Sequence, residues 1–155
     1  TASLQGHTGG VAAVRFSSDG QSLSSCGWDA TVRFWDVTTG EQQAMLRDPE
    51  GEGLWSLALS STGDWLASGN TKGTLSRWDC RAPRYHALLI GHDNDVQSVR
   101  FNANGTKLSS TDVEGNSIYW DLQTGTRLDG NLKDRFPLES LRSRLPCWDS
   151  PSPAD

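Results

Sequence analysis

The sequence has few of the residues that usually mark metal, disulfide or membrane proteins. Its three cysteines and three histidines are scattered singly, without the close pairs that zinc sites use. An odd cysteine count without a cysteine-rich framework indicates reduced thiols, and therefore an intracellular protein in the cytoplasm or nucleus. No apolar run approaches the roughly 18 residues of a membrane span. We therefore expect no metal, no cofactor and no membrane segment.

Basic stripes and phosphate-binding loops are missing as well. The net charge is −5, and the arginines are spread along the chain, so nucleic acid is not expected as a partner. Lys72-Gly73-Thr74 lacks the upstream glycine spacing that cradles a phosphate. These absences argue against nucleic-acid binding and nucleotide-driven chemistry.

A repeated Trp-Asp dipeptide is the most informative feature that the sequence does contain. Its tryptophans are Trp35, Trp78 and Trp120, and two Gly-His pairs at His7 and His92 keep the same period. A fixed period of this length is typical of repeat architectures. Three units therefore fill residues 1–132, at about 6–47, 48–90 and 91–132.

Each unit has the pattern of four short strands. In unit one, strand-like segments cover 11–16, 22–27, 31–35 and 41–46, and Asp19-Gly20 marks the first hairpin turn. The first strands carry apolar residues that step by three and then two, as in Val11, Val14 and Phe16, which predicts a β-bulge near each strand start. The third strands are apolar on both faces, so neighbouring sheets must cover them, and stacked four-stranded units form a β-propeller.

These motifs together resemble the WD40 family: Gly-His, the Val-x-x-Val-x-Phe run, a serine-rich second strand, an acidic turn and Trp-Asp. The resemblance implies an all-β WD40 β-propeller with three four-stranded blades of an incomplete ring and a non-repeat C-terminal tail. Propellers usually contain about four to eight blades, so we expect further blades in the same or another chain.

The regions outside the repeats carry separate expectations. Residues 1–5 are predicted to be the outer strand of a preceding blade. Residues 133–155 form the non-repeat tail. For this tail two alternatives stay open: a short amphipathic helix followed by disorder, or a flexible end that docks nowhere.

The resemblance also implies a buried hydrogen-bonded tetrad of His, Ser, Asp and Trp in each blade. The first tetrad falls on His7, Ser25, Asp29 and Trp35; the third falls on His92, Ser110, Glu114 and Trp120; the second keeps only Ser68 and Trp78. In unit two, Glu50 takes the histidine position and Lys72 takes the aspartate position. We therefore expect these two residues to form an ion pair.

A serine, a histidine and an aspartate in one unit also raise the alternative of a hydrolase. No nucleophile elbow or oxyanion loop accompanies them, and the serine falls inside a predicted strand. We therefore expect the tetrads to be structural and the protein not to be an enzyme.

The family's partner-binding top face is commonly lined by fixed positions near the Gly-His and the acidic turn. Here these positions hold Gly10, Ala12, Trp28, Gly53, Trp55, Thr71, Asp95, Gln97 and Val113. Trp28 and Trp55 fall on adjacent blades and are predicted to be exposed interface anchors; the alternative is a core role. We therefore expect a non-catalytic scaffold or adaptor that binds proteins or peptides on its top face. Two other readings are a structural subunit docked in a large assembly and a regulatory propeller of a larger enzyme.

Overall fold

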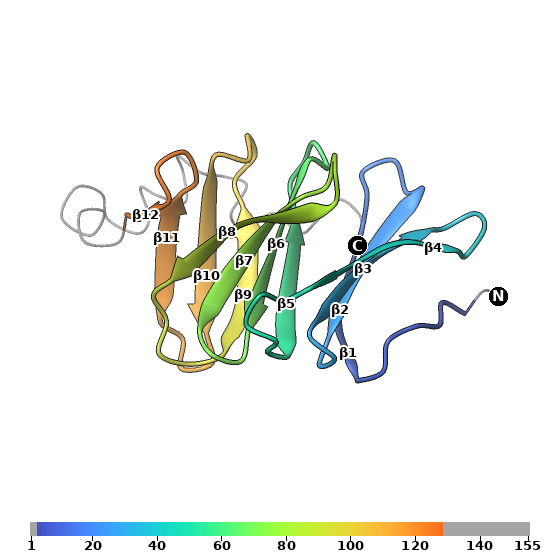
Figure 1. Cartoon of the computed structure of the whole chain (residues 1–155). Coiled ribbons are helices and arrows are strands. Elements are labelled where there is room, and N and C mark those ends of the chain that lie inside the picture. The colour runs from blue at the N-terminus through green and yellow to red at the C-terminus, as the bar shows by residue number, and fades with distance from the viewer. Residues whose placement is uncertain (1–2, 129–155) are drawn as a thin grey trace.

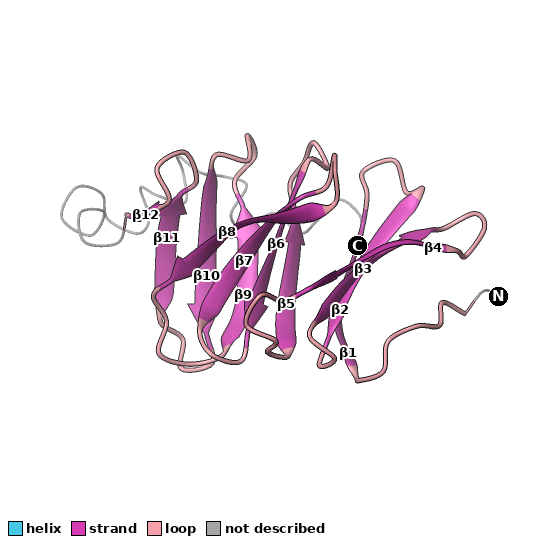
Figure 2. Cartoon of the chain, in the orientation of Figure 1, coloured by secondary structure: helices cyan, strands magenta, loops and turns pink. Residues whose placement is uncertain are grey.

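The computed structural model describes residues 3–128, and throughout this range the protein is built from β-strands and loops without a helix (Figure 2). No helix of this range is therefore long and apolar enough to cross a membrane. The twelve strands are β1 (Val11–Phe16), β2 (Ser22–Gly27), β3 (Thr31–Asp36), β4 (Gln42–Arg47), β5 (Leu54–Leu59), β6 (Trp65–Asn70), β7 (Thr74–Asp79), β8 (Arg84–Ile90), β9 (Val96–Phe101), β10 (Lys107–Asp112), β11 (Ser117–Asp121) and β12 (Thr126–Arg127).

The strands form three antiparallel four-stranded sheets that stand side by side as blades (Figure 1). Blade one has the order β1-β2-β3-β4, blade two β5-β6-β7-β8, and blade three β9-β10-β11-β12. The first strands of the blades are neighbours, because β1 packs next to β5 and β5 next to β9. Three consecutive blades of a propeller, as the repeats predicted, are therefore confirmed.

The local turn and bulge predictions are confirmed too. The hairpin glycines Gly20, Gly63 and Gly105 all have φ near 70–78°, in the left-handed region that glycine enters without steric cost. The register of each first strand shifts near its start, for example between Val11 and Ala13 in β1. The bulge explains why the apolar side chains of these strands step by three and then by two.

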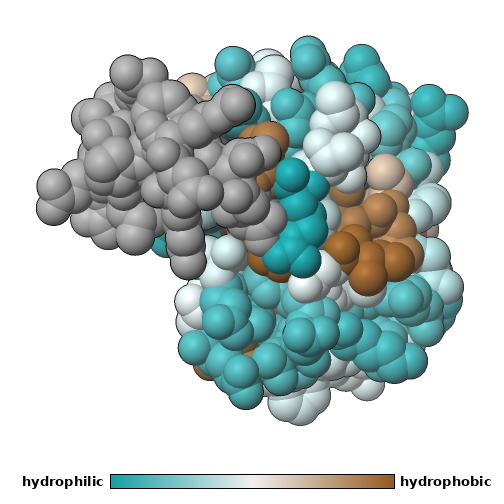
Figure 3. Space-filling view, turned by 90° about the vertical axis from the view of Figure 1, so that its left-hand side faces the viewer, coloured by the Kyte–Doolittle hydropathy of each residue, from teal (hydrophilic) through white to brown (hydrophobic). Residues whose placement is uncertain are grey.

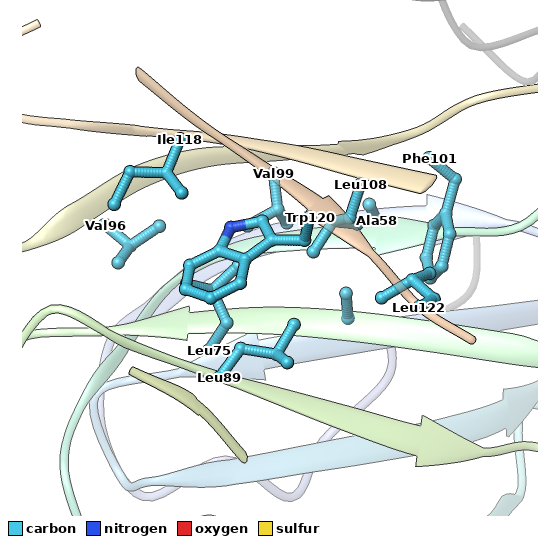
Figure 4. Packing of buried hydrophobic residues seen from close by; sticks show 11 residues of the cluster. Ala58, Leu75, Leu89, Val96, Val99, Phe101, Leu108, Ile118, Trp120 and Leu122 are labelled. Carbon is cyan, nitrogen blue, oxygen red and sulfur yellow. The ribbon is translucent and has the colours of Figure 1, made fainter. Parts of the chain in front are cut away.

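The hydrophobic core lies between the blades rather than inside any one of them. Between blades one and two, Cys26 and Val32 pack against Leu54, Leu57 and Trp78. Between blades two and three, the indole of Trp120 is surrounded by aliphatic side chains from both sheets (Figure 4). Each blade thus buries its two faces only against its neighbours, as expected for a solenoid-like repeat.

The two ends of the row of blades carry apolar side chains at the surface. On blade one, Val11, Val14 and Phe16 of β1 are exposed. Figure 3 looks onto the side that carries blade three, where hydrophobic patches lie among mostly hydrophilic described residues. The blade-one end therefore has an apolar first strand that no other blade of residues 3–128 covers.

The outer parts of the chain complete the fold. Residues 3–5 form no strand, and within residues 3–128 no blade precedes blade one. Their assignment to such a blade therefore stays a prediction. The predicted tail at 133–155 lies outside the described residues.

Candidate functional site

A chain of four hydrogen-bonded side chains links the strands of blade one. The indole Nε1 of Trp35 donates to the Ser25 hydroxyl over 2.8 Å, and Ser25 Oγ lies 2.7 Å from Nε2 of His7. Nδ1 of His7 lies 2.9 Å from Oδ2 of Asp29. Because a carboxylate can only accept, Nδ1 carries the proton, and Nε2 of a neutral ring accepts from Ser25. The four residues assigned to the first tetrad are in direct contact.

Asp29 is the charged end of this chain, and its pKa is about 2. Burial opposes ionisation, but hydrogen bonds from the Thr31 hydroxyl, the Thr8 amide and His7 outweigh that effect. At the other end, Ser25 is only 3% exposed within β2, so no substrate can reach its hydroxyl. The network therefore links the loop before β1 to β2, to β3 and to the hairpin between them.

Blade three repeats the bonds among tryptophan, serine and histidine, but the acid nearest its histidine is Asp112, so the prediction of Glu114 is wrong. Trp120 Nε1 donates to Ser110 over 2.9 Å, and Ser110 Oγ lies 2.7 Å from Nε2 of His92. Nδ1 of His92 lies 3.5 Å from Oδ2 of Asp112, whereas Glu114 is exposed. The acid of blade three therefore lies two residues after its serine, whereas Asp29 of blade one lies four residues after Ser25.

The space available at the end of the second strand accounts for this difference in the position of the acid. Asp112 is the last residue of β10, a place that Gly27 holds in β2. A Cβ on Gly27 would lie 2.5 Å from the carbonyl oxygen of Gly10, so blade one has no room for an acid there. Burial opposes ionisation of Asp112, but hydrogen bonds from Asn116 and from the Glu114 amide prevail and lower its pKa.

Blade two keeps the indole–hydroxyl bond and replaces the rest of the network. Trp78 Nε1 donates to Ser68 over 2.9 Å. Glu50, at the histidine position, accepts from the Asn70 amide over 2.9 Å and from the Thr74 hydroxyl. In blade two the acceptor, Glu50, therefore lies in the loop between the blades, and its donors lie at the β6–β7 hairpin. In blade one the loop residue His7 donates, and the hairpin residue Asp29 accepts.

The predicted ion pair between Glu50 and Lys72 is wrong. Lys72 Nζ lies 2.6 Å from Oε1 of Glu52 instead. Their hydrogen bond raises the pKa of Lys72 and lowers that of Glu52. The cause is local: the side-chain oxygen of Asn70 accepts from the Lys72 amide, closing the turn with the lysine side chain exposed.

Asp48 is a buried carboxylate that sequence reasoning missed. It accepts from the Ser76 hydroxyl over 3.2 Å and from the amides of Glu50 and Glu52. Burial raises the pKa of Asp48 despite these bonds. The available signal was its position two residues before Glu50, in the loop that replaces a Gly-His pair.

The two indoles predicted to face a partner lie against each other across the boundary between blades one and two. Trp28 follows β2, and Trp55 is the second residue of β5. Their ring centroids are 5.2 Å apart and the rings are inclined by 62°, an edge-to-face contact. Trp28 is 60% exposed and Trp55 is 38% exposed. The pair forms an apolar ledge on the surface, which we call the Trp28–Trp55 ledge.

The other predicted top-face residues lie at the same end of the blades, which is the lower end in Figure 1. They are Gly10, Ala12, Gly53, Thr71, Asp95, Gln97 and Val113. The amide of Val113 donates to the Asp95 carbonyl over 3.0 Å, which ties the hairpin of blade three to its own first strand. Thr71 and Trp28 both lie beside Gly53, where an added Cβ would be 3.7 Å and 3.5 Å from them.

A groove of about 520 Å³ runs from the ledge along the first strands of the three blades. It is lined by 11–15 of β1, 55–57 of β5 and 97–100 of β9. Trp55 and Gln97 belong to this lining, so the ledge and the groove form one continuous surface. The groove thus joins two predicted site residues, Trp55 and Gln97, in one hollow.

Trp65 packs at the opposite end of blade two. The Arg77 guanidinium lies 3.8 Å above its ring, and the ring of His86 meets it edge-on at 4.8 Å. Cys26 and Cys80 are free thiols, and burial raises the pKa of both to about 12. Within residues 3–128, no three His, Cys, Asp or Glu side chains gather as they would around a metal ion.

Comparison with known proteins places the chain in a family. Residues 1–36, 40–79 and 84–121 each match the family model described as WD domain, G-beta repeat. These segments make up more than half of the sequence, and each contains the first three strands of one blade, so the protein belongs to the WD40-repeat family.

Individual relatives agree with this assignment. The chain is 30% identical over 152 residues to nuclear distribution protein PAC1-2 of Uncinocarpus reesii, covering 84% of this chain and 33% of that protein. It is 31% identical over 132 residues to the guanine nucleotide-binding protein subunit beta of Oryza sativa subsp. japonica, covering 81% and 35%. The chain thus spans about a third of the length of these relatives.

A solved structure shows the same fold. The structure of U3-55K superimposes with a TM-score of 0.75 at 22% identity, covering 81% of this chain and 40% of that one. At this level of identity the likeness concerns the fold alone.

Proposed function

We propose that this chain is a non-catalytic scaffold that binds a protein or peptide partner through the Trp28–Trp55 ledge. The observation that carries the proposal is the contact between two exposed indoles from adjacent blades. Tryptophan is enriched among residues whose removal costs an interface more than about 2 kcal/mol. Two such rings side by side, with Thr71 and Gln97 around them, match the apolar centre and polar rim of a docking site.

The continuity of the ledge with the groove along the first strands favours an extended ligand. A peptide that covers the ledge can continue along the first strands of the three blades, where Gln97 offers hydrogen bonds beside Trp55. The tetrads at the same end contribute rigidity, because each ties a loop to two strands. A rigid site loses less conformational entropy on binding.

Photo-crosslinking tests the proposed surface. A photoreactive amino acid at Gln97 is expected to crosslink a partner retained from a cell extract, and the same group at Gln123, on the opposite end, is not. The crosslink at position 97 should disappear in the Trp28→Ala, Trp55→Ala double variant. Equal crosslinking from positions 97 and 123 would contradict a top-face site.

The exposed face of blade one favours a second role, as part of a larger assembly. Val11, Val14 and Phe16 are exposed there, although their counterparts in blades two and three contact the preceding blade. We propose that further blades, in the same or another chain, cover this face. The rice relative is by name a subunit, which agrees with such a role.

This second role has its own test. A Phe16→Asp substitution should abolish association with the covering blades and leave crosslinking at position 97 intact. A Phe16→Asp protein that associates as the unchanged chain does would show that this face is not an interface.

A further inference from the structure

The connecting loops at the ledge end carry a local excess of negative charge, with seven of the 19 Asp and Glu residues of the chain. They contain a single cation, Lys72, and seven carboxylates: Asp29, Asp48, Glu50, Glu52, Asp93, Asp95 and Glu114. The loops at the opposite end also contain a single cation, Arg81, but only three carboxylates: Asp19, Glu41 and Asp64. The formal excess of six charges at the ledge end exceeds the net charge of the whole chain, −5. The loops around the ledge therefore carry a larger negative excess than the loops at the opposite end, where the excess is two. The guanidinium groups of Arg47 and Arg127 also reach the ledge end, where they donate to backbone carbonyls.

Not all of these carboxylates are available to a ligand. Asp29 is bonded to His7, Glu52 is paired with Lys72, and Asp48 is buried. Their charges are already matched by groups of the protein or held away from solvent.

Three carboxylates on blade three differ from these. The side chains of Asp93, Asp95 and Glu114 make no hydrogen bond or ion pair with any residue in the described range 3–128. Asp95 leads into β9, which packs next to the β5 strand that bears Trp55. Unsatisfied negative charge thus lies on the blade adjacent to the ledge.

Exposed indole rings and free carboxylates together recognise one kind of side chain. A tryptophan ring attracts a cation over its face, and it is the strongest aromatic partner for this contact. Nearby carboxylates add electrostatic attraction and repel acidic segments. An acidic or purely aliphatic segment would leave this charge unused.

From this juxtaposition we infer that the segment docking on the Trp28–Trp55 ledge is a basic peptide, with an arginine or lysine over the indoles and further positive charge facing Asp93 and Asp95. The inference rests on the proposed function and adds the chemistry of the partner. Charge complementarity selects the ligand, and the indoles supply the apolar contact.

A pair of matched peptides tests the inference on the full chain. One peptide carries three arginines separated by Gly-Ser, and the other replaces each arginine by citrulline, which keeps the shape but has no charge. In the 15N-labelled protein, the arginine peptide should shift the indole N–H signals of Trp28 and Trp55 and leave that of Trp65 unmoved. The citrulline peptide should bind at least about fivefold more weakly, since losing about 1 kcal/mol corresponds to that factor.

Charge variants sharpen the test. Asp93→Asn with Asp95→Asn should weaken the arginine peptide by about fivefold. Glu41→Gln, which removes an exposed carboxylate at the opposite end, is the matched control and should change nothing. Equal binding of both peptides, tighter binding of a glutamate peptide, or no indole shift with any peptide would overturn the inference.

The proposed function and this inference can fail separately. If a natural partner is lost on Trp28→Ala with Trp55→Ala but is unaffected by Asp93→Asn with Asp95→Asn, the ledge binds a partner that is not basic. If neither double variant affects the partner, the docking site itself is misplaced.

Discussion

Phe16 in blade one and Phe101 in blade three hold the same place in their repeats, yet Phe16 is 39% exposed and Phe101 is 8% exposed. Val14 and Val99 repeat this contrast, at 45% and 3%. The strands that carry them, β1 and β9, have the same bulge and pair with their second strands in the same way. Only the neighbour differs: blade two covers β9, and no preceding blade covers β1 within residues 3–128.

The contrast shows that a position in the repeat does not decide alone whether a side chain is core or surface. In a propeller each apolar face is completed by the next sheet, so the same residue type stabilises one blade and exposes another. The indoles follow the same rule. Trp35, Trp78 and Trp120 are buried within networks, whereas Trp28 and Trp55 project from the end of the stack.

The largest expected effect separates the two phenylalanines. Phe101→Ala should lower the free energy of unfolding by about 3–5 kcal/mol, because it leaves a cavity between blades two and three. Phe16→Ala should cost about 1 kcal/mol or less, because much of that ring is already in solvent. Urea denaturation followed by the buried tryptophans measures both. Equal losses would mean that β1 is covered in solution by something outside the described residues.

The next effect compares the networks of blades one and two. His7→Ala leaves the buried Asp29 and Ser25 without their partner, so it should destabilise the protein by about 1–3 kcal/mol. Glu50→Ala should cost about 1 kcal/mol or less, since Glu50 is largely exposed and water can replace it. Thermal unfolding of both variants shows which substitution lowers the stability more. A costlier Glu50→Ala would assign the main structural role to blade two.

The dependence of the unfolding free energy on pH below about 4 tests the same network of blade one. The pKa of Asp29 is about 2 when folded and near its ordinary value of 3.8 when unfolded. Its contribution, about 2 kcal/mol, is therefore complete above pH about 4 and is lost as the pH falls toward 2. Asp29→Asn should flatten this part of the stability curve. Asp48, whose pKa is raised, has the opposite slope, so Asp48→Asn should not flatten it. Identical acid limbs for both variants would contradict the assignment.

The smallest expected effect concerns the ledge. Trp28→Ala alone should reduce the unfolding free energy by about 1 kcal/mol, the worth of an exposed aromatic pair. Trp120→Ala, the matched buried indole, should cost about 3–5 kcal/mol. Chemical denaturation of the two variants under one condition measures both losses of unfolding free energy. A comparable loss for both would place Trp28 in the core.

The sequence predicted the architecture well because its period, turn residues and bulge step are local signals. Gly20, Gly63 and Gly105 marked the hairpins, and the first tetrad was found residue by residue. The assignments of Glu114 and of the Glu50–Lys72 ion pair were wrong, because the backbone at each turn sets where the charged side chain lies, and the sequence spacing does not. Asp112 reaches its histidine from the end of a strand, and Lys72 turns toward Glu52.

Other features depend on neighbouring blades and could be predicted only in part. The repeat predicted that Trp28 and Trp55 lie on adjacent blades, but only the structure shows their edge-to-face contact. The exposure of Phe16 follows from the incomplete ring of three repeats and not from the pattern within a repeat, which is the same in a blade that is covered.

The central claim is that the Trp28–Trp55 ledge is a docking surface and not part of the core. The most direct test measures partner capture and unfolding free energy on the same Trp28→Ala, Trp55→Ala double variant. We predict that capture is lost while the unfolding free energy falls by no more than about 2 kcal/mol. Retained capture, or a loss of stability as large as that of Trp120→Ala, would contradict the claim.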